Sequence, residues 1–515
     1  MNRKKILFGL FIFICSVTVI SPSKSEERAR ITNNGLDPAM SAKIETIANE
    51  GMKKWNAPGL AIGIVKDGKL AWEGYFGYAN IEKQQPVTET TAFRIGSISK
   101  TFTAVAIMQL VEQGKFKPDD PIDDFAPYPV FRQKYSCCAK PTFMNVFTHT
   151  SGGGEFKYLW QPINPKDPVL MMPKGKLRPD LKTLYRSGIT TKICPGDKWA
   201  YCNYCVGALG LALENITGQS FKDYTDQRIF KPLGMNSSSF YETDAALANV
   251  AQGYEYKSDE KKFKPIDLVI IDAVPAGNIY TTVQDMSRYM IAMMNHGRLG
   301  EAQILKPETV DYMFAPHFGL DPRLPKMGVN FILNDNYFGH RVVGHNGGLP
   351  GFTSEMKLAL DDRVGVIVVN NAGSSAPGEI VAQIFQVLFN YQEPAEIQPS
   401  REIWPQLEGR YVSPEPDFLS DLRFLQGARG AYRVFESKGK LYLGSNKPGD
   451  RRELRQVAKD DPYYLRVVKK ESHMHGYILF KPGADGKAGS LILGLNEYVR
   501  AGEPRKKPCA QKEKL

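Results

Sequence analysis

Long apolar runs are scarce in this chain of 515 residues. After residue 20, no stretch holds enough uninterrupted apolar residues to cross a bilayer as a helix. No segment repeats at a fixed period, and no module that reads nucleic acid is present. These absences exclude a multi-span membrane protein and a repeat architecture, and they leave nucleic acid without a binding site. The length predicts two or more globular domains.

The one early apolar run has the pattern of a secretory signal. Arg3, Lys4 and Lys5 precede the apolar stretch 6–20, and small and polar residues follow it. This order predicts a signal peptide over residues 1–25 and an exported protein, periplasmic or secreted. An uncleaved N-terminal anchor is the alternative. A lipoprotein anchor is disfavoured because Cys15 follows Ile14 and not a small residue.

The chain carries a formal net charge of +11, and part of the excess lies in a basic tail over 505–515. A modest basic excess favours anionic surfaces such as envelope polymers. A solvated tail without a partner is the simpler interpretation of the charge run.

Cysteine is rare, with seven residues in all. Cys15 lies in the predicted signal, and five of the other six fall between 137 and 205, which predicts one or two local disulfides in an exported protein. A thiolate metal site is an open alternative, built from Cys202 and Cys205 with Cys137 and Cys138. Adjacent cysteines make poor joint zinc ligands, so we expect no metal.

Strand patterns come early and late in the chain, with helical patterns between and after them. This order predicts an α+β fold: one antiparallel sheet flanked by helices, with a mostly helical insertion across one end. We expect this domain over 36–392, a linker over 393–402 and a small C-terminal all-β domain over 403–504. The expected helices cover 36–56, 97–113, 203–214, 282–294 and 377–391, and the expected strands cover 60–65, 70–76, 353–360 and 363–370.

The pair Ser97 and Lys100 carries the clearest chemistry. It opens an amphipathic, helix-like segment that ends at Gly114, and residues three apart on a helix share one face. A serine hydroxyl is a weak nucleophile until a nearby base takes its proton, and a buried amine can be that base. Other serines precede a lysine by three residues, Ser437 before Lys440 among them, but only Ser97 begins a long helical segment.

Two further motifs join this pair. Tyr201-Cys202-Asn203 leads into a helix, and Gly344-His345-Asn346-Gly347-Gly348 precedes the first late strand. With these motifs the chain resembles the serine β-lactamase and penicillin-binding-protein superfamily, specifically the class C β-lactamase-like serine hydrolases. The resemblance covers about 36–392 and is supported by Phe147-Thr148-His149-Thr150-Ser151-Gly152, by 228–235 and by Pro275-Ala276-Gly277-Asn278.

The resemblance implies a role for each motif residue. Ser97 is the expected acylated nucleophile, and Lys100 and Tyr201 are expected to share the role of general base. Asn203 and His345 are expected to bind substrate, and Gly347 to let the substrate approach the strand. The backbone N–H groups of Ser97 and Gly348 form the expected oxyanion hole. His149 lies in a stretch that is structural in the family, and no metal or other cofactor is implied.

His345 departs from the lysine that dedicated class C β-lactamases carry at this point, and histidine is charged only part of the time near neutral pH. This residue favours the DD-peptidase, D-aminopeptidase and esterase relatives. We expect an exported hydrolase that acts through an acyl-enzyme on an amide or ester, with a D-amino-acid peptide, such as one derived from peptidoglycan, as substrate. The alternatives are an esterase or weak β-lactamase, and a penicillin-binding envelope protein without turnover.

Overall fold

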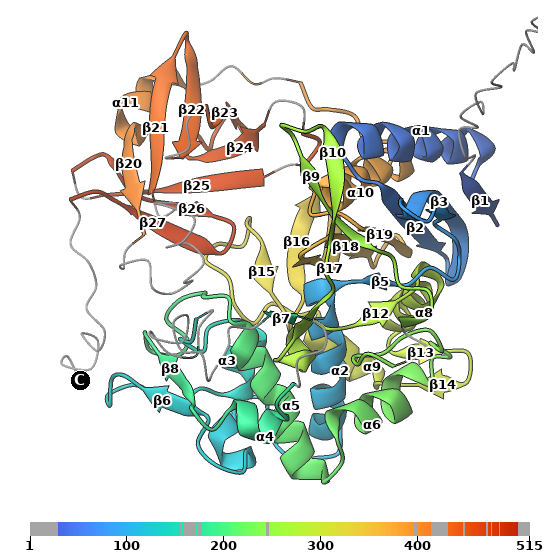
Figure 1. Cartoon of the computed structure of the whole chain (residues 1–515). Coiled ribbons are helices and arrows are strands. Elements are labelled where there is room, and N and C mark those ends of the chain that lie inside the picture. The colour runs from blue at the N-terminus through green and yellow to red at the C-terminus, as the bar shows by residue number, and fades with distance from the viewer. Residues whose placement is uncertain are drawn as a thin grey trace, which may run out of the picture.

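A computed structural model describes residues 29–502, apart from short internal gaps. The gaps are 155–156, 158–170, 174–177, 244–246, 396, 398–399, 414–430, 446–448, 470–471, 475 and 484. The predicted signal peptide, the basic tail, Cys15 and Cys509 lie outside the described residues. Figure 1 shows a mixed body of sheet and helices with a barrel of strands beside it.

The central sheet is antiparallel and draws its strands from both ends of its domain, which confirms the predicted topology. Within the described residues nine strands form it, and β4 (Gln85–Pro86) pairs beside β3. β2 and β19 sit next to each other, with Gly63 opposite Ile367. The order is β1 (Arg30–Asn33), β3 (Lys69–Asn80), β2 (Gly59–Lys66), β19 (Val364–Asn370), β18 (Phe352–Ala359), β17 (His340–Leu349), β16 (Ile332–Tyr337) and β15 (Lys326–Met327).

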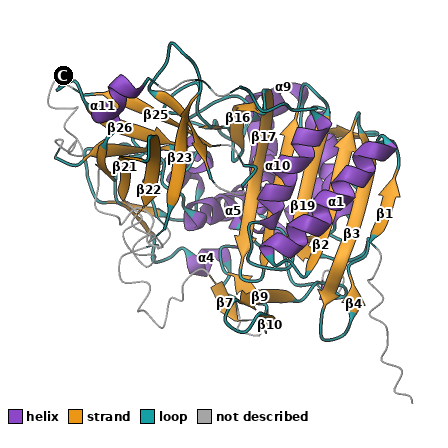
Figure 2. Cartoon of the chain, turned by 90° about the horizontal axis from the view of Figure 1, so that it is seen from above, coloured by secondary structure: helices purple, strands orange, loops and turns teal. Residues whose placement is uncertain are grey.

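Two helices cover one face of this sheet, α1 (Pro38–Trp55) and α10 (Ala376–Leu388) (Figure 2). The Asp37 side chain caps α1 by accepting from the N–H groups of Ala39 and Met40. The two helices pack closely, because a Cβ added at Gly51 would lie 2.7 Å from the side chain of Ile380. The predicted helices over 36–56 and 377–391 are therefore present and bury one face of the sheet.

The helix that follows Ser97 lies on the other face, at the centre of the main core. It consists of the short turn η1 (Gly96–Ile98) and α2 (Ser99–Glu112), and Gly114 follows with a left-handed φ of +68°. Every residue from Ser99 to Leu110 is buried. The prediction that this segment is amphipathic was wrong, because α2 is enclosed by other elements on all sides, as expected for a helix that is apolar all round.

The neighbours of α2 are the other predicted helices, α5 (Asn203–Thr217) and α8 (Val283–Met294). The Thr282 hydroxyl caps α8 as predicted, while the Asp285 carboxylate accepts from Ser237 and Ser238. Short elements fill the rest of the body: β5 (Phe93–Arg94), η2 (Ile122–Phe125), β6 (Phe131–Gln133), α3 (Phe143–Phe147), β7 (Met171–Pro173), α4 (Leu181–Leu184), β8 (Ile189–Thr191), α6 (Phe221–Thr225), η4 (Asp226–Phe230), β9 (Gly253–Lys257), β10 (Lys262–Ile266), β11 (Val269–Ile271), η5 (Val274–Ala276), β12 (Tyr280–Thr281), β13 (Arg298–Leu299), β14 (Ala302–Gln303) and α9 (Pro307–Met313).

The C-terminal part is the predicted all-β domain, and its strands close into a barrel. After η6 (Arg401–Ile403) and α11 (Trp404–Leu407), the closed order runs through β20 (Gly409–Val412), β21 (Ala431–Ser437), β22 (Lys440–Ser445), β23 (Arg451–Gln456), β24 (Tyr464–Val468), β25 (Gly476–Pro482), β26 (Ala488–Leu493) and β27 (Asn496–Arg500). Apolar side chains such as Leu443, Ile478 and Leu491 fill its interior. The apolar alternation in the sequence predicts short strands over 409–412, 441–443, 463–468 and 477–480, and it misses β21, β23, β26 and β27. The boundaries at 393–402 stay a prediction.

The barrel contacts the body through a small apolar cluster and polar contacts beside β15. Leu324 packs with Tyr464, Leu479 and Ile492, and Arg323 forms an ion pair with Asp461. On the other side of the interface, the buried Glu379 of α10 accepts a hydrogen bond of 2.8 Å from the N–H of His473. These contacts place the barrel against the β15–β16 edge of the sheet (Figure 1).

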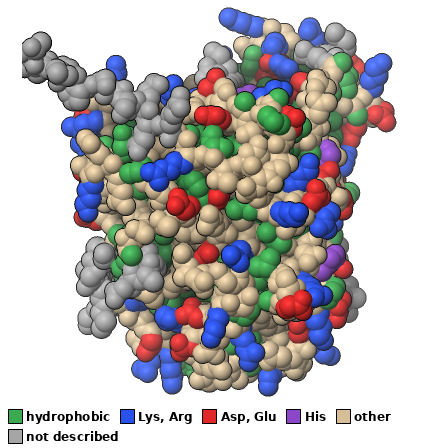
Figure 3. All heavy atoms as spheres, turned by 90° about the vertical axis from the view of Figure 1, so that its right-hand side faces the viewer, with side chains coloured by type: hydrophobic (Ala, Val, Ile, Leu, Met, Phe, Trp, Pro, Cys, Tyr) green, Lys and Arg blue, Asp and Glu red, His purple; other side chains and the backbone are tan. Residues whose placement is uncertain are grey.

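The surface carries charges of both signs in close alternation. Figure 3 shows one face on which lysine and arginine side chains are interspersed with aspartate and glutamate. Among the described residues, no helix is long and apolar enough to cross a membrane.

Removing the Phe102 ring tests the central place of α2. This ring is fully buried and stacks on Tyr289 at a centroid distance of 3.8 Å. We expect Phe102→Ala to lower the free energy of unfolding in urea by about 3–5 kcal/mol, because it removes a buried ring and leaves a cavity. Tyr312→Ala, at the more exposed Tyr312 of α9, is the control and should change it by less than about 1 kcal/mol. Equal losses in both variants would contradict this packing.

Candidate active site

Ser97 lies at the junction between the central sheet and α2. It belongs to η1, directly after Gly96, whose left-handed φ of +53° turns the chain into the helix. Its side chain is half-buried, and the Lys100 ammonium one turn later is fully buried. The predicted spacing therefore places both groups on one face, with the hydroxyl at the surface and the amine beneath it.

Three acceptors from separate segments surround Lys100 Nζ. It donates to Ser97 Oγ at 3.0 Å, to Asn203 Oδ1 at 2.7 Å and to the carbonyl oxygen of Ala276 at 2.6 Å. An ammonium has three N–H donors, so these bonds match its full capacity. A buried charge is tolerated only when it is paired in this way.

Tyr201 contacts the same serine, although the two residues lie 104 positions apart in the chain. Its phenol donates to Ser97 Oγ at 2.7 Å, and Lys100 Nζ lies 4.8 Å from the centre of its ring. Tyr201 stands two residues before Asn203, the first residue of α5. The structure therefore brings Ser97, Lys100, Tyr201 and Asn203 together as the sequence predicted.

The cysteines near this motif are oxidised. Cys202 pairs with Cys205 within the first turn of α5, and Cys138 pairs with Cys194. Cys137 is also disulfide-bonded. The prediction of local disulfides is confirmed. The alternative of a thiolate metal site at Cys202, Cys205, Cys137 and Cys138 fails, because a sulfur in a disulfide carries no thiolate for a metal.

The third motif lies within strand β17, whereas the sequence pattern placed it before the first late strand. β16 pairs with β17 only up to Gly344 among the described residues, so the edge from His345 to Leu349 stays open towards η1. A Cβ added at Gly96 would lie 2.7 Å from the backbone nitrogen of Gly348. The two predicted oxyanion donors, the N–H groups of Ser97 and Gly348, therefore come from adjacent backbone segments.

Gly347 lies against the backbone that precedes η1. A Cβ at this position would lie 1.9 Å from the carbonyl oxygen of Ile95 and 2.5 Å from Ser354 Oγ. The missing side chain thus lets the backbone before η1 approach β17, and the role of Gly347 towards the substrate stays a prediction. At Gly348 a Cβ would meet no atom within 4 Å, so the open side of the strand is at Gly348.

His345 is buried and uncharged. Its side chain is 3% exposed, and its Nδ1 donates to the carbonyl oxygen of Asn346 at 2.6 Å. Burial, followed by the charges of Lys100 and Lys357, lowers the pKa of His345 to about 3. The expected partial charge near neutral pH is therefore absent, because a proton here would be desolvated beside the Lys100 ammonium.

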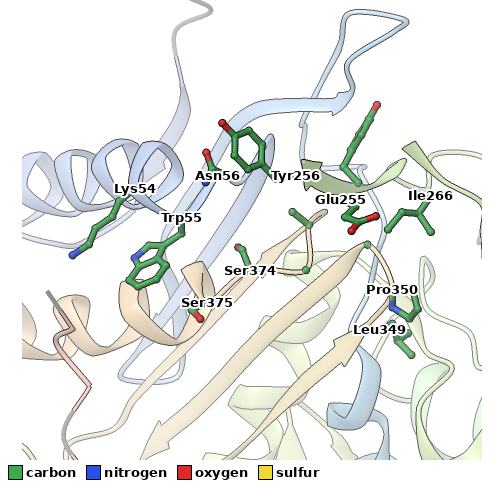
Figure 4. Close-up of a pocket in the computed structure, with 14 residues that line it drawn as sticks. Lys54, Trp55, Asn56, Glu255, Tyr256, Ile266, Leu349, Pro350, Ser374 and Ser375 are labelled. Atoms are coloured by element: carbon green, nitrogen blue, oxygen red, sulfur yellow. The ribbon is translucent and has the colours of Figure 1, made fainter. Parts of the chain in front are cut away.

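A pocket of about 510 Å³ begins where β17 ends (Figure 4). The turn Leu349–Gly351 forms one wall, and Trp55 at the end of α1 and Tyr256 on β9 contribute aromatic faces. None of the predicted site residues lines it. Leu349, one of its lining residues, directly follows Gly348 in the chain.

Comparison with known proteins agrees with this geometry. The family model described as Beta-lactamase matches residues 44–389. The chain belongs to the beta-lactamase family. The match includes Ser97, Lys100, Tyr201, Asn203 and His345, and it stops before the barrel.

The relatives are distant. The putative penicillin-binding protein PbpX of Bacillus subtilis (strain 168) is 25% identical over 411 residues, which cover 75% of this chain and 95% of that protein. Protein flp of Staphylococcus aureus (strain COL) is 24% identical over 370 residues, with 70% and 68% covered. The fold matches an octameric penicillin-binding protein homologue from Pyrococcus abyssi with a TM-score of 0.58 and 24% identity, covering 89% of this chain and 100% of that one.

Sequence reasoning missed the backbone groups of the site. The Ala276 carbonyl holds Lys100, and the Ile95 carbonyl packs on Gly347, yet a backbone oxygen leaves no side-chain signal. The stretch Pro275-Ala276-Gly277 supported the family resemblance, and its position in η5 explains why it matters.

Because His345 is buried and neutral, we expect the free energy of unfolding to fall as the pH is lowered. In the unfolded chain histidine binds a proton near pH 6.5, while folded His345 stays neutral down to about pH 3. Its contribution to stability is therefore present above pH 6.5 and is lost by about 1.4 kcal/mol per pH unit as the pH falls from 6.5 towards 3. We expect His345→Gln to lose less stability between pH 7 and 4.5, measured by urea unfolding. A wild-type pH slope in this variant would contradict a neutral His345.

Proposed function

We propose that the protein is a serine hydrolase that cleaves an amide or ester through an acyl-enzyme on Ser97. The observation that carries the proposal is the double contact at Ser97 Oγ, with Lys100 Nζ at 3.0 Å and Tyr201 Oη at 2.7 Å. A hydroxyl that contacts an amine and a phenol can pass its proton, as it attacks, to the one of them that is deprotonated when substrate binds. Membership of the beta-lactamase family supports the same reaction class.

The chemical steps follow from these contacts. Ser97 Oγ attacks the carbonyl carbon while its proton passes to the deprotonated member of the pair, either a neutral Lys100 amine or a Tyr201 phenolate. The N–H groups of Ser97 and Gly348 stabilise the negative oxygen of the tetrahedral intermediate. The pair returns the proton to the leaving amine or alcohol, whose bond to carbon breaks. Water then hydrolyses the ester on Ser97 through the same proton path. Asn203 accepts from Lys100 and so holds the amine beside the serine.

The third motif bears on the substrate class. His345 is neutral and stands where dedicated class C β-lactamases carry a charged lysine, which favours the peptidase and esterase relatives over a strong β-lactamase. We propose a D-amino-acid peptide of envelope origin, cleaved in the manner of a DD-carboxypeptidase or D-aminopeptidase, by an exported enzyme. An esterase or weak β-lactamase uses the same groups, and a penicillin-binding protein without turnover would retain the acylation step alone.

The pocket at the end of β17 suggests where the acyl side of the substrate extends. Pro350 stands two residues beyond Gly348, at most about 7 Å along the chain. We propose that a long acyl group on Ser97 reaches Trp55 and Tyr256, whereas an acetyl group does not. The aromatic lining favours an apolar or flat acyl group.

Loss of the Ser97 hydroxyl tests the reaction class. We expect intact-mass spectrometry of the wild type to show an acyl adduct, or turnover, with a chromogenic β-lactam or a p-nitrophenyl ester. Both should vanish in Ser97→Ala because the nucleophile is gone. Ser437→Ala is the matched control, since Ser437 also precedes a lysine by three residues but lies on the barrel, and it should behave as the wild type. An adduct that survives in Ser97→Ala would refute the proposal.

Removing an aromatic side chain from the pocket tests whether the acyl group of the substrate lies there. We expect Trp55→Ala to lower kcat/KM for p-nitrophenyl octanoate by about tenfold, because the variant removes apolar contact worth about 1.4 kcal/mol. Its kcat/KM for p-nitrophenyl acetate should stay unchanged, because acetate does not reach the pocket. Lys53→Ala, at an exposed neighbour outside the pocket, is the control. Equal losses for both esters would place the acyl group elsewhere.

A further inference from the structure

His149, expected to be structural, lies directly against the candidate general base. The imidazole is 1% exposed, and its ring centre is 4.2 Å from that of Tyr201, at an angle of 33°. The Trp199 ring also contacts the imidazole edge-on, at a distance of 6.1 Å between the ring centres. The phenol that touches Ser97 is thus packed against a histidine from the segment after α3.

His149 forms hydrogen bonds with the residues on both sides of Tyr201. The carbonyl oxygen of His149 accepts from the N–H of Ala200 at 2.7 Å, and the His149 Nδ1 accepts from the N–H of Cys202 at 3.3 Å. These two donors are the residues immediately before and after Tyr201. Ring stacking adds a third contact, so the position and tilt of the phenol are defined by one residue.

The protonation state of His149 follows from the same contacts. Because Nδ1 accepts an N–H, its lone pair is unprotonated and the proton of the neutral ring lies on Nε2. Burial, with smaller contributions from Lys100 and His345, holds the pKa of His149 well below its usual value. Nε2 has no hydrogen-bond partner within the described part of the chain. The ring is therefore a neutral, fixed acceptor and no proton carrier for Ser97.

The geometry of His149 is itself constrained. Its φ of +56° lies in the left-handed region that side chains other than glycine seldom adopt. The N–H of His149 donates to the carbonyl oxygen of Val146 at 3.1 Å, which ties this conformation to the end of α3. A strained backbone at a residue that contacts a reactive group is typical of a positioning role.

The Cys202–Cys205 disulfide completes the support below Tyr201. A Cβ added at Gly153 would lie 2.5 Å from Cys205 Sγ and 3.0 Å from Cys202 Sγ, so the chain that leaves His149 covers the disulfide. The segment 149–153 therefore contacts Tyr201 through the His149 imidazole and also packs against the sulfur atoms of the disulfide.

We propose that His149 is a positioning residue that holds the Tyr201 phenol at hydrogen-bond distance from Ser97. The proposal rests on the proposed function, because it needs Tyr201 to exchange the serine proton. It assigns His149 no contact with substrate. His149 raises the rate of acylation because it keeps the Tyr201 phenol oriented towards Ser97.

Two amide variants separate this role from simple packing. The shorter side chain of the H149N variant would place a carbonyl oxygen where Nδ1 lies, whereas the longer side chain of H149Q places it nearer Nε2. We expect H149Q to lower kcat with a p-nitrophenyl ester by about 30-fold with little change in KM. H149N should recover part of that loss because it keeps the bond to the Cys202 N–H. His340→Asn is the control, since His340 stacks on Phe389 at 3.6 Å and contacts none of the motif residues, and it should leave kcat unchanged.

A double-mutant cycle with Tyr201→Phe completes the test. If His149 acts through Tyr201, H149Q should cost at most about twofold more in the Tyr201→Phe background. An equal 30-fold loss in both backgrounds, or no rescue by H149N in a folded protein, would overturn the positioning role. If Tyr201→Phe itself keeps wild-type kcat, the proposed function of Tyr201 fails instead. Circular dichroism of each variant establishes that it is folded.

Discussion

The buried ammonium of Lys100 is the constraint on which the rest of the site depends. A charge without water must be fully hydrogen-bonded, and its three partners come from η1, α5 and η5. These segments are far apart in the sequence, with Asn203 103 positions and Ala276 176 positions from Lys100. Satisfying one side chain therefore fixes the relative positions of three elements of the core, and Ser97, the proposed nucleophile, is one of the partners.

The same charge sets the electrostatics around it. It contributes to the lowered pKa of both His149 and His345, which burial alone already disfavours as cations. The site therefore concentrates its positive charge on one amine beneath Ser97 and keeps both histidines neutral. This division leaves the imidazoles to act as hydrogen-bonding and packing groups, and it separates proton transfer from substrate recognition.

The site also requires strand β17 of the sheet to approach η1 closely. The Ile95 carbonyl occupies the space where a side chain of residue 347 would be, and Gly96 lies against the backbone of Gly348. Backbone N–H groups from two segments can meet only where no Cβ intervenes. The two predicted oxyanion donors and the Ser97 hydroxyl are thus placed by glycines, and none of the described residues of the barrel takes part in this contact.

The order of strand and helix patterns along the chain predicted the fold class and the sheet built from both ends of the domain. Local spacing singled out Ser97 and Lys100, and the resemblance to a known family joined Tyr201 and Asn203 to them. The enclosure of α2, the strand position of His345, the contact between Gly347 and Ile95 and the grip of His149 on Tyr201 were decided by the tertiary structure. Each of these depends on which segments meet in space. Burial and the pKa of a histidine follow from its neighbours, and short alternating strands such as β21 and β23 form only when the barrel closes and pairs their edges.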